Sequence, residues 1–105
     1  METISMQDLY KKLGKLEKGE VILDIRTAEE YAEGHVPGSI NITHTELLNH
    51  LDEIKKYKKI YMHCRSGGRV KMSLPGLTAA GINNIVSIVN GGMMEWSAAG
   101  YPEER

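Results

Sequence analysis

Short apolar runs alternate with helical patterns along the chain, and this alternation predicts the elements of the fold. The runs are nearly continuous, as is typical of strands that are buried on both faces of a sheet. They predict strands at residues 21–25, 39–42, 59–63 and 85–89, and they allow an edge strand at residues 3–4.

Between these runs, polar residues mark the starts of helices. Ser5 begins a pattern whose leucines recur at helical spacing. Thr27 stands three residues before Glu30, and Thr43 stands three residues before Glu46. Each pair predicts a capping box, in which both residues bond the free backbone N–H groups of a helix start. The helix after Thr43 should bury one face, formed by Leu47, Leu48, Leu51 and Ile54.

Strands that alternate with helices predict an α/β fold with a mostly parallel sheet and helices on both faces. A last short helix is expected at residues 93–99. The length of 105 residues suits one domain, residues 1–105, without repeats or linkers. In open sheets of this class, sites form at the carboxyl ends of strands, so chemistry is expected there.

The helical pattern after the third strand contains Pro75 and Gly76. Proline has no N–H group, and its ring clashes with the carbonyl four residues earlier, here that of Lys71. The helix is therefore expected to kink or break. The apolar residues around the interruption could be core or a partly exposed lip, and the pattern leaves both open for Met72, Leu74 and Leu77.

The composition, 41% hydrophobic and 26% charged, is that of an ordinary globular protein. No run approaches the roughly 18 apolar residues of a membrane span, and the first ten residues do not resemble an export signal. Cys64 is the single cysteine and cannot form an internal disulfide. A lone thiol fits a reducing compartment, so the sequence predicts a cytoplasmic protein, with a monomer as the default state.

The net charge of −1 conceals an uneven distribution, because residues 55–93 contain no Asp or Glu. Arg65, Arg69 and Lys71 bracket Cys64, and this local excess of positive charge favours an anionic substrate. No dense basic tract with interleaved aromatic residues is present, which argues against nucleic acid. Four further lysines are interpreted as a solvated helix end: Lys55, Lys56, Lys58 and Lys59.

Cys64 stands where the third strand enters a glycine-rich turn, Cys-Arg-Ser-Gly-Gly-Arg at residues 64–69. Gly67 and Gly68 allow successive N–H groups to converge on one point. The helix that starts near Arg69 adds its own free N–H groups and the positive end of its dipole. Such a cradle stabilises a thiolate, and the predicted chemistry is nucleophilic attack by sulfur.

Other interpretations of this segment are weaker. An inert buried cysteine is the plain alternative for Cys64. His63 should not be its base, since successive strand residues point to opposite faces, and a packing or hydrogen-bonding role is expected instead. The histidines and the cysteine lack the spacing of a metal site, so no metal or other cofactor is predicted. The turn also lacks the pattern of a nucleotide-binding P-loop.

Four motifs together resemble the rhodanese (thiosulfate sulfurtransferase) domain family. They are Leu-Asp-Ile-Arg-Thr-Ala-Glu-Glu-Tyr at 23–31, Gly-His-Val-Pro-Gly-Ser-Ile-Asn-Ile at 34–42, the turn at 64–69 and Gly-Gly-Met-Met-Glu-Trp at 91–96. The resemblance implies a five-stranded parallel sheet. It also implies a cysteine that takes a sulfane sulfur from a donor such as thiosulfate and carries it as a persulfide. Cyanide, a thiol or a protein would accept that sulfur.

The resemblance assigns roles to individual residues. Cys64 matches the nucleophile, and Asp24 matches a carboxylate at a strand end that helps to hold the active-site loop. Trp96 matches a packing residue. The loop that binds the persulfide and the donor anion is matched by Arg65, Ser66, Gly67, Gly68 and Arg69, and a structural turn by His35, Pro37 and Gly38.

Three other functions remain as alternatives. Cysteine-based phosphatases share such a cradle, but their signature has five residues between cysteine and arginine, whereas four separate Cys64 from Arg69. The smaller loop suits a single sulfur atom and crowds a tetrahedral phosphate, and no acid in it could protonate a leaving alcohol. Arsenate reduction is disfavoured further by the absence of a second cysteine. A carrier module that docks a partner and relays sulfur at low turnover is the third alternative.

Overall fold

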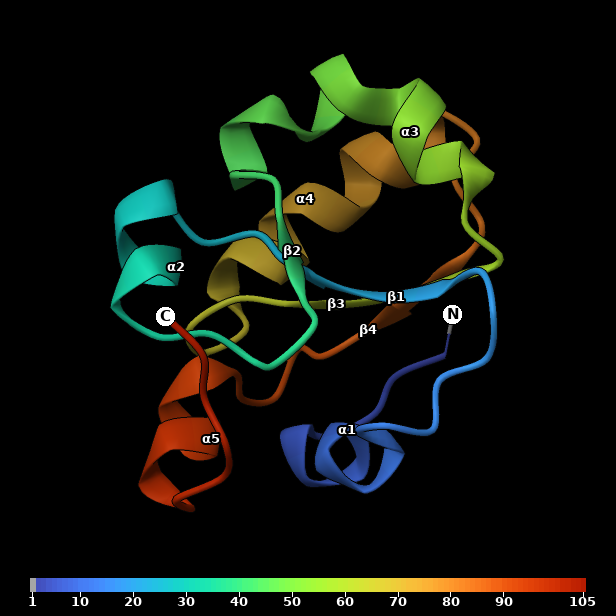
Figure 1. The fold of residues 1–105 in the computed structure, drawn as a ribbon. Helices are drawn as coiled ribbons and strands as arrows, with labels where there is room; N and C mark the ends of the chain where they lie inside the picture. Colours follow the sequence, from blue (N-terminus) through green and yellow to red (C-terminus); the bar gives the residue numbers. More distant parts are fainter. Residues whose placement is uncertain (1) are drawn as a thin grey trace.

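The computed structural model describes residues 2–105 and contains a parallel sheet with helices on both faces (Figure 1). Its strands are β1 (Glu20–Asp24), β2 (Ile40–Asn41), β3 (Lys59–His63) and β4 (Ile85–Ser87), in the order β2-β1-β3-β4. Every neighbouring pair is parallel. All four predicted strands are confirmed, with β2 and β4 shorter than the apolar runs. At the β4 edge, Thr3 forms one parallel bridge to Ser87 in place of a full fifth strand.

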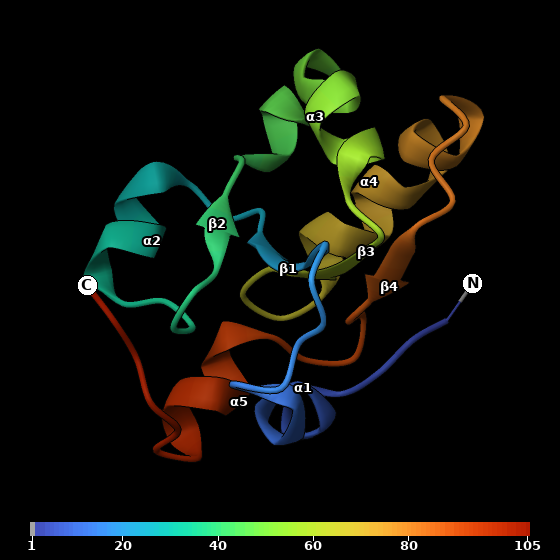
Figure 2. The ribbon, with the colours of Figure 1, turned by 45° about the vertical axis from the view of Figure 1, so that its right-hand side comes forward.

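Helices cover both faces of the sheet (Figure 2). On one face lie α1 (Met6–Lys12) and α5 (Met93–Ala98), which contact each other. The other face carries α2 (Ala28–Glu33), the 3-10 helix η1 (His44–His50), α3 (Leu51–Lys56) and α4 (Gly68–Ala79). None of the helices in the described chain is long and apolar enough to cross a bilayer.

The core has two parts because strand side chains alternate between the faces. Met62 and Cys64 belong to the part beneath α3 and α4. Tyr61, directly before Met62 on β3, belongs to the part beside α1 and α5. The carboxyl end of β3 therefore directs Cys64 toward α4.

Two of the three expected helix starts have their caps. The Ser5 hydroxyl accepts the Asp8 N–H at 3.0 Å, and the Thr27 hydroxyl accepts the Glu30 N–H at 3.2 Å. In both cases the carboxylate at the third position returns a bond to the capping backbone, which completes the box.

The prediction of a capping box at Thr43 is wrong. The segment that follows is a 3-10 helix, η1, before α3 begins at Leu51, and the Thr43 side chain caps neither. Its hydroxyl lies 3.3 Å from the Arg26 carbonyl oxygen and donates to it. A tertiary contact thus takes the group that would have capped the helix.

Pro75 does not break α4, which continues from Gly68 to Ala79. The lost backbone bond is offset because α4 packs along the sheet and buries Val70 and Leu77 completely. Leu77 is therefore a core residue, whereas Met72 is 79% exposed.

Candidate active site

The Cys64 side chain is buried at the start of the turn that directly follows β3. The residue is 1% exposed and packs among apolar side chains, yet its Sγ accepts a hydrogen bond from the Gly67 N–H at 3.1 Å. Gly67 has φ +106°, a left-handed conformation that side chains disfavour. The glycine thus bends the chain so that a backbone donor faces the sulfur. One amide makes this contact, where the sequence predicted several converging donors.

The rest of the turn leads from the buried sulfur to the surface. Arg65 and Ser66 are exposed, and Gly68 is exposed at the first residue of α4. The free N–H groups of the first α4 turn and the positive end of its dipole therefore lie beside Cys64. The structure brings together the predicted nucleophile and the loop residues that follow it.

A second segment, residues 89–94, holds the turn in place. The Met93 N–H donates to the Cys64 carbonyl at 2.9 Å, and the Met94 N–H donates to the Arg65 carbonyl at 3.1 Å. A β-carbon on Gly92 would lie 2.6 Å from the Arg65 carbonyl oxygen and closer still to that of Cys64. Gly92 permits this approach. Its role was not predicted from the sequence, although the Gly91-Gly92 pair belongs to one of the four motifs.

Arg69 forms a bidentate ion pair with Glu30. Its Nη1 lies 2.6 Å from Glu30 Oε1, and its Nη2 lies 2.9 Å from Oε2. The Arg69 guanidinium, helped by the Thr27 donors, lowers the pKa of Glu30 to about 2, against the opposing effect of burial. Sequence reasoning identified Glu30 only as a helix cap and did not connect it with the loop.

The ion pair between Glu30 and Arg69 should make the stability of the protein depend on pH. A carboxyl whose pKa falls on folding stabilises the protein fully above its unfolded pKa, near 4.5 here, and loses that contribution as the pH falls through about 2. Glu30→Gln should remove roughly 1–3 kcal/mol of unfolding free energy at neutral pH and flatten the decline between about pH 5 and 2. Urea denaturation at a series of pH values measures both effects. If the unfolding free energy of this variant declines between about pH 5 and 2 as steeply as that of the unaltered protein, the assignment is wrong.

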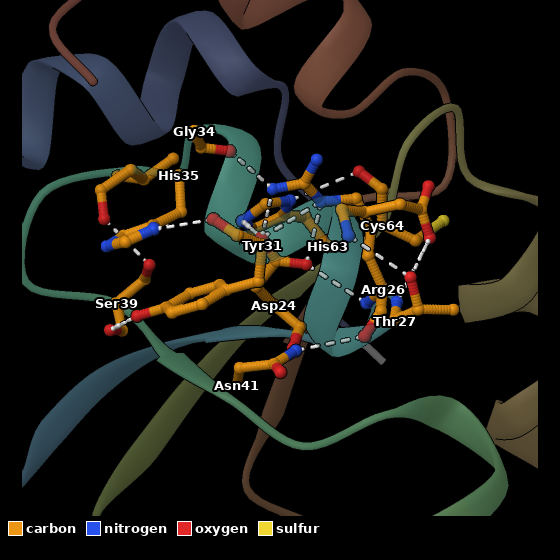
Figure 3. A network of polar contacts seen from close by, with 12 residues as sticks. Asp24, Arg26, Thr27, Tyr31, Gly34, His35, Ser39, Asn41, His63 and Cys64 are labelled. Atoms are coloured by element: carbon orange, nitrogen blue, oxygen red, sulfur yellow. Dashed lines mark hydrogen bonds and ion pairs between the residues drawn. The ribbon is translucent and has the colours of Figure 1, made fainter. Parts of the chain in front are cut away.

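Asp24, at the end of β1, forms a buried ion pair with Arg26 (Figure 3). Its carboxylate accepts bonds from the Arg26 backbone N–H, Nε and Nη2 at 2.8–3.0 Å. Arg26 Nη2 also donates to the Gly34 carbonyl at 2.8 Å. These contacts include no bond from Asp24 to the active-site loop, which the resemblance expects Asp24 to help hold. Asp24 instead anchors Arg26, a residue that sequence reasoning missed, and through it the end of α2.

His63 lies between Asp24 and Cys64, as Figure 3 shows. Its Nδ1 is 3.1 Å from the Cys64 carbonyl oxygen, and its Nε2 is 4.0 Å from Asp24 Oδ2. Burial lowers the pKa of His63, and the Asp24 charge opposes this effect. A neutral ring that bonds the Cys64 backbone agrees with the predicted hydrogen-bonding role.

The remaining predicted positions lie outside the turn. His35 stacks on Tyr31 with ring centres 3.7 Å apart, and its Nδ1 is 2.8 Å from the Tyr31 carbonyl oxygen. Trp96 is fully buried, and its Nε1 donates to the Pro102 carbonyl at 2.6 Å. Pro37 and Gly38 belong to the turn before β2. Within residues 2–105, no group of three His, Cys, Asp or Glu side chains could hold a metal ion.

A comparison with family models matches residues 5–99 to the model described as the rhodanese-like domain. The chain belongs to the rhodanese family. This membership confirms the resemblance drawn from the four motifs.

Solved and named relatives agree with this assignment. A rhodanese-related protein from Thermoplasma volcanium superposes with a TM-score of 0.81 at 31% identity, over 99% of this chain and 98% of that one. Thiosulfate sulfurtransferase 16, chloroplastic, of Arabidopsis thaliana is 30% identical over 96 residues, which cover 80% of this chain and 79% of that protein. A protein of Bacillus subtilis named as a candidate sulfur carrier is 33% identical over 76 residues, which cover 72% of this chain.

The chain spans only 40% of the length of that Bacillus protein, and 40% of another relative that is 38% identical. The rhodanese relatives are thus named both as sulfurtransferases and as a sulfur carrier. Sulfur donors and acceptors are the general class of partner that these names indicate.

Proposed function

We propose that this rhodanese domain is a sulfurtransferase that uses Cys64 as its nucleophile and thiosulfate, or a similar small anion, as its donor. The observation that carries the proposal is the bond from the Gly67 N–H to the Cys64 sulfur, 3.1 Å long, at the carboxyl end of β3. An N–H group held against sulfur by a left-handed glycine stabilises negative charge on that atom in the folded state. A cysteine that only fills space in the core would gain little from such a donor, because its thiol stays uncharged.

In the first half of the reaction, the Cys64 thiolate attacks the outer sulfur of thiosulfate. A bond forms between Sγ and that sulfur, the sulfur–sulfur bond of thiosulfate breaks, and sulfite leaves with the electron pair. The exposed residues Arg65 and Ser66 would meet the donor anion, and the Gly67 and Gly68 backbone would hold the persulfide. Because Cys64 is 1% exposed, small donors should be favoured.

In the second half, an acceptor nucleophile attacks the outer persulfide sulfur and Cys64 leaves as a thiolate. Cyanide would become thiocyanate, and a thiol would become a persulfide. This is a ping-pong scheme with one covalent intermediate, and neither step requires a cofactor. A free thiol that carries sulfur suits a reducing compartment such as the cytoplasm.

A carrier module is the second candidate, and the Bacillus relative named as a candidate sulfur carrier supports it. A carrier forms the same persulfide but passes the sulfur within a complex. The two functions differ in turnover with small acceptors.

Intact mass measurement after incubation with thiosulfate tests the proposal. We expect the protein to gain the mass of one sulfur atom and to lose it again on addition of cyanide, with release of thiocyanate. Cys64→Ser, which replaces sulfur by oxygen, should show neither change. If the unaltered protein gains no mass from any sulfane donor, the proposal is wrong. Persulfide formation without steady turnover would identify the carrier, and hydrolysis of an aryl phosphate by Cys64 would identify a phosphatase.

A further inference from the structure

The positive charges predicted around Cys64 are not equally available to a ligand. Both terminal nitrogens of the Arg69 guanidinium donate to the Glu30 carboxylate, at 2.6 and 2.9 Å. The two side chains are 24% and 28% exposed, so water screens their attraction only in part. Arg69 lies in the first turn of α4, directly after the turn that begins at Cys64, and the bond to Glu30 is the main cause that raises the pKa of its guanidinium.

Glu30 is fixed in this position from a second side. Its Oε1 accepts bonds from the Thr27 backbone N–H at 3.0 Å and from the Thr27 hydroxyl at 3.1 Å. The same oxygen accepts the shorter bond from Arg69, so one carboxylate joins the start of α2 to the first turn of α4. Arg69 therefore cannot turn toward a donor without giving up an organised ion pair.

Arg65 has a different environment. It is exposed, and no ion pair of its side chain is found among residues 2–105. Asp24 and Arg26 balance each other in a separate buried pair. Of the two arginines that follow Cys64 in the turn, only Arg65 offers a charge without an ion-pair partner among residues 2–105.

We propose that Glu30 determines the charge that the active-site turn presents to an incoming sulfur donor, because it neutralises Arg69 and leaves Arg65 as the arginine that receives the anion. This inference rests on the proposed function, since it assigns a specificity role at the same site. Glu30 touches neither the sulfur nor the donor in this arrangement and is a positioning residue. Removal of the Glu30 charge should therefore strengthen the attraction of the site for anions. Most substitutions at an active site weaken substrate binding or catalysis instead.

Alkylation of Cys64 by iodoacetate, which is an anion, and by iodoacetamide, which is neutral and of similar size, tests the charge directly. The ratio of the two rates reports the local potential and cancels differences in access and nucleophilicity. We expect Glu30→Gln to raise the ratio of iodoacetate to iodoacetamide about 3- to 10-fold at low salt, and high salt to reduce this gain. Glutamine keeps the capping box and one bond to Arg69, so the fold should persist.

Three further variants separate the effect of the pair from a general effect of charge. Glu29→Gln makes the same change of charge one position away, on an exposed residue of α2, and should leave the ratio within about twofold of the original value. Arg69→Gln leaves Glu30 uncompensated and should lower the ratio. The double variant Glu30→Gln/Arg69→Gln should return to the original ratio, because the two charges cancel. In turnover, Glu30→Gln should lower the KM for thiosulfate more than it changes kcat.

The outcomes distinguish failure of this inference from failure of the proposed function. If Cys64 in the unaltered protein reacts with neither reagent and forms no persulfide, it is not an accessible nucleophile and both proposals are wrong. If it reacts but Glu30→Gln gives the same ratio as Glu29→Gln, or a lower one, Glu30 does not set the charge at the site. The sulfurtransferase proposal would survive that result.

Discussion

Replacing Gly92 by alanine is expected to reduce sulfur transfer by about 100-fold, although the residue carries no chemistry. The added β-carbon would lie 2.6 Å from the carbonyl carbon and oxygen of Arg65, and closer still to the Cys64 carbonyl oxygen. Real β-carbons do not approach backbone atoms so closely, and backbone cannot move aside as a flexible side chain can. The turn must shift, and a displacement of about 1 Å in a reacting group can cost a factor of 100 in rate. A stability loss of about 1–3 kcal/mol should accompany it.

Gly76→Ala is the matched control for this prediction. Gly76 lies inside α4, and the nearest neighbour of an added β-carbon is the end of the Leu48 side chain at 4.0 Å. This variant should keep full activity and gain up to about 1 kcal/mol of stability, since alanine is the better helix former. Thiocyanate formation and urea denaturation measure both variants. Normal turnover in Gly92→Ala would show that the turn does not depend on its packing against residues 89–94.

The features that the sequence predicted correctly are those encoded locally. The four strands follow from apolar runs, the helix start at Ser5 follows from leucines at helical spacing, and the cap at Thr27 follows from residue types three positions apart. The position of Cys64 at the carboxyl end of a strand could be predicted because it directly follows an apolar run and precedes a glycine pair. In each case, neighbours along the chain supply the physical cause.

The features that the sequence left open depend on contacts between distant segments. Glu30 and Arg69 are 39 positions apart, and nothing in either local pattern indicates that the two meet. Sequence reasoning therefore counted Arg69 as a free cation. The contact of Gly92 with the turn has the same origin. Local rules predicted a capping box at Thr43 and a kink or break at Pro75. A tertiary contact takes the Thr43 hydroxyl, and α4 continues through Pro75.

Loss of the buried Asp24 carboxylate should be the most destabilising single change at this site. Asp24 is completely buried, and three donor groups of Arg26 bond to it within 3.0 Å. Asp24→Ala leaves the Arg26 guanidinium buried without its counter-ion, which costs about 3–5 kcal/mol in comparable pairs. The whole domain is expected to have only about 5–15 kcal/mol of stability. Asp24→Ala should therefore unfold at a much lower urea concentration and lose sulfur transfer through unfolding.

The variant Asp24→Ala/Arg26→Met tests whether the unpaired charge is the cause. Methionine keeps much of the arginine stem without the charge, so the double variant should be more stable than Asp24→Ala despite carrying one more substitution. Glu33→Ala, an exposed carboxylate at the end of α2, should change the unfolding free energy by no more than about 0.5 kcal/mol. Urea midpoints of the three variants decide the matter. A double variant that is less stable than Asp24→Ala would show that Arg26 stabilises the fold mainly through its bond to Gly34 and its packing, and not through its charge.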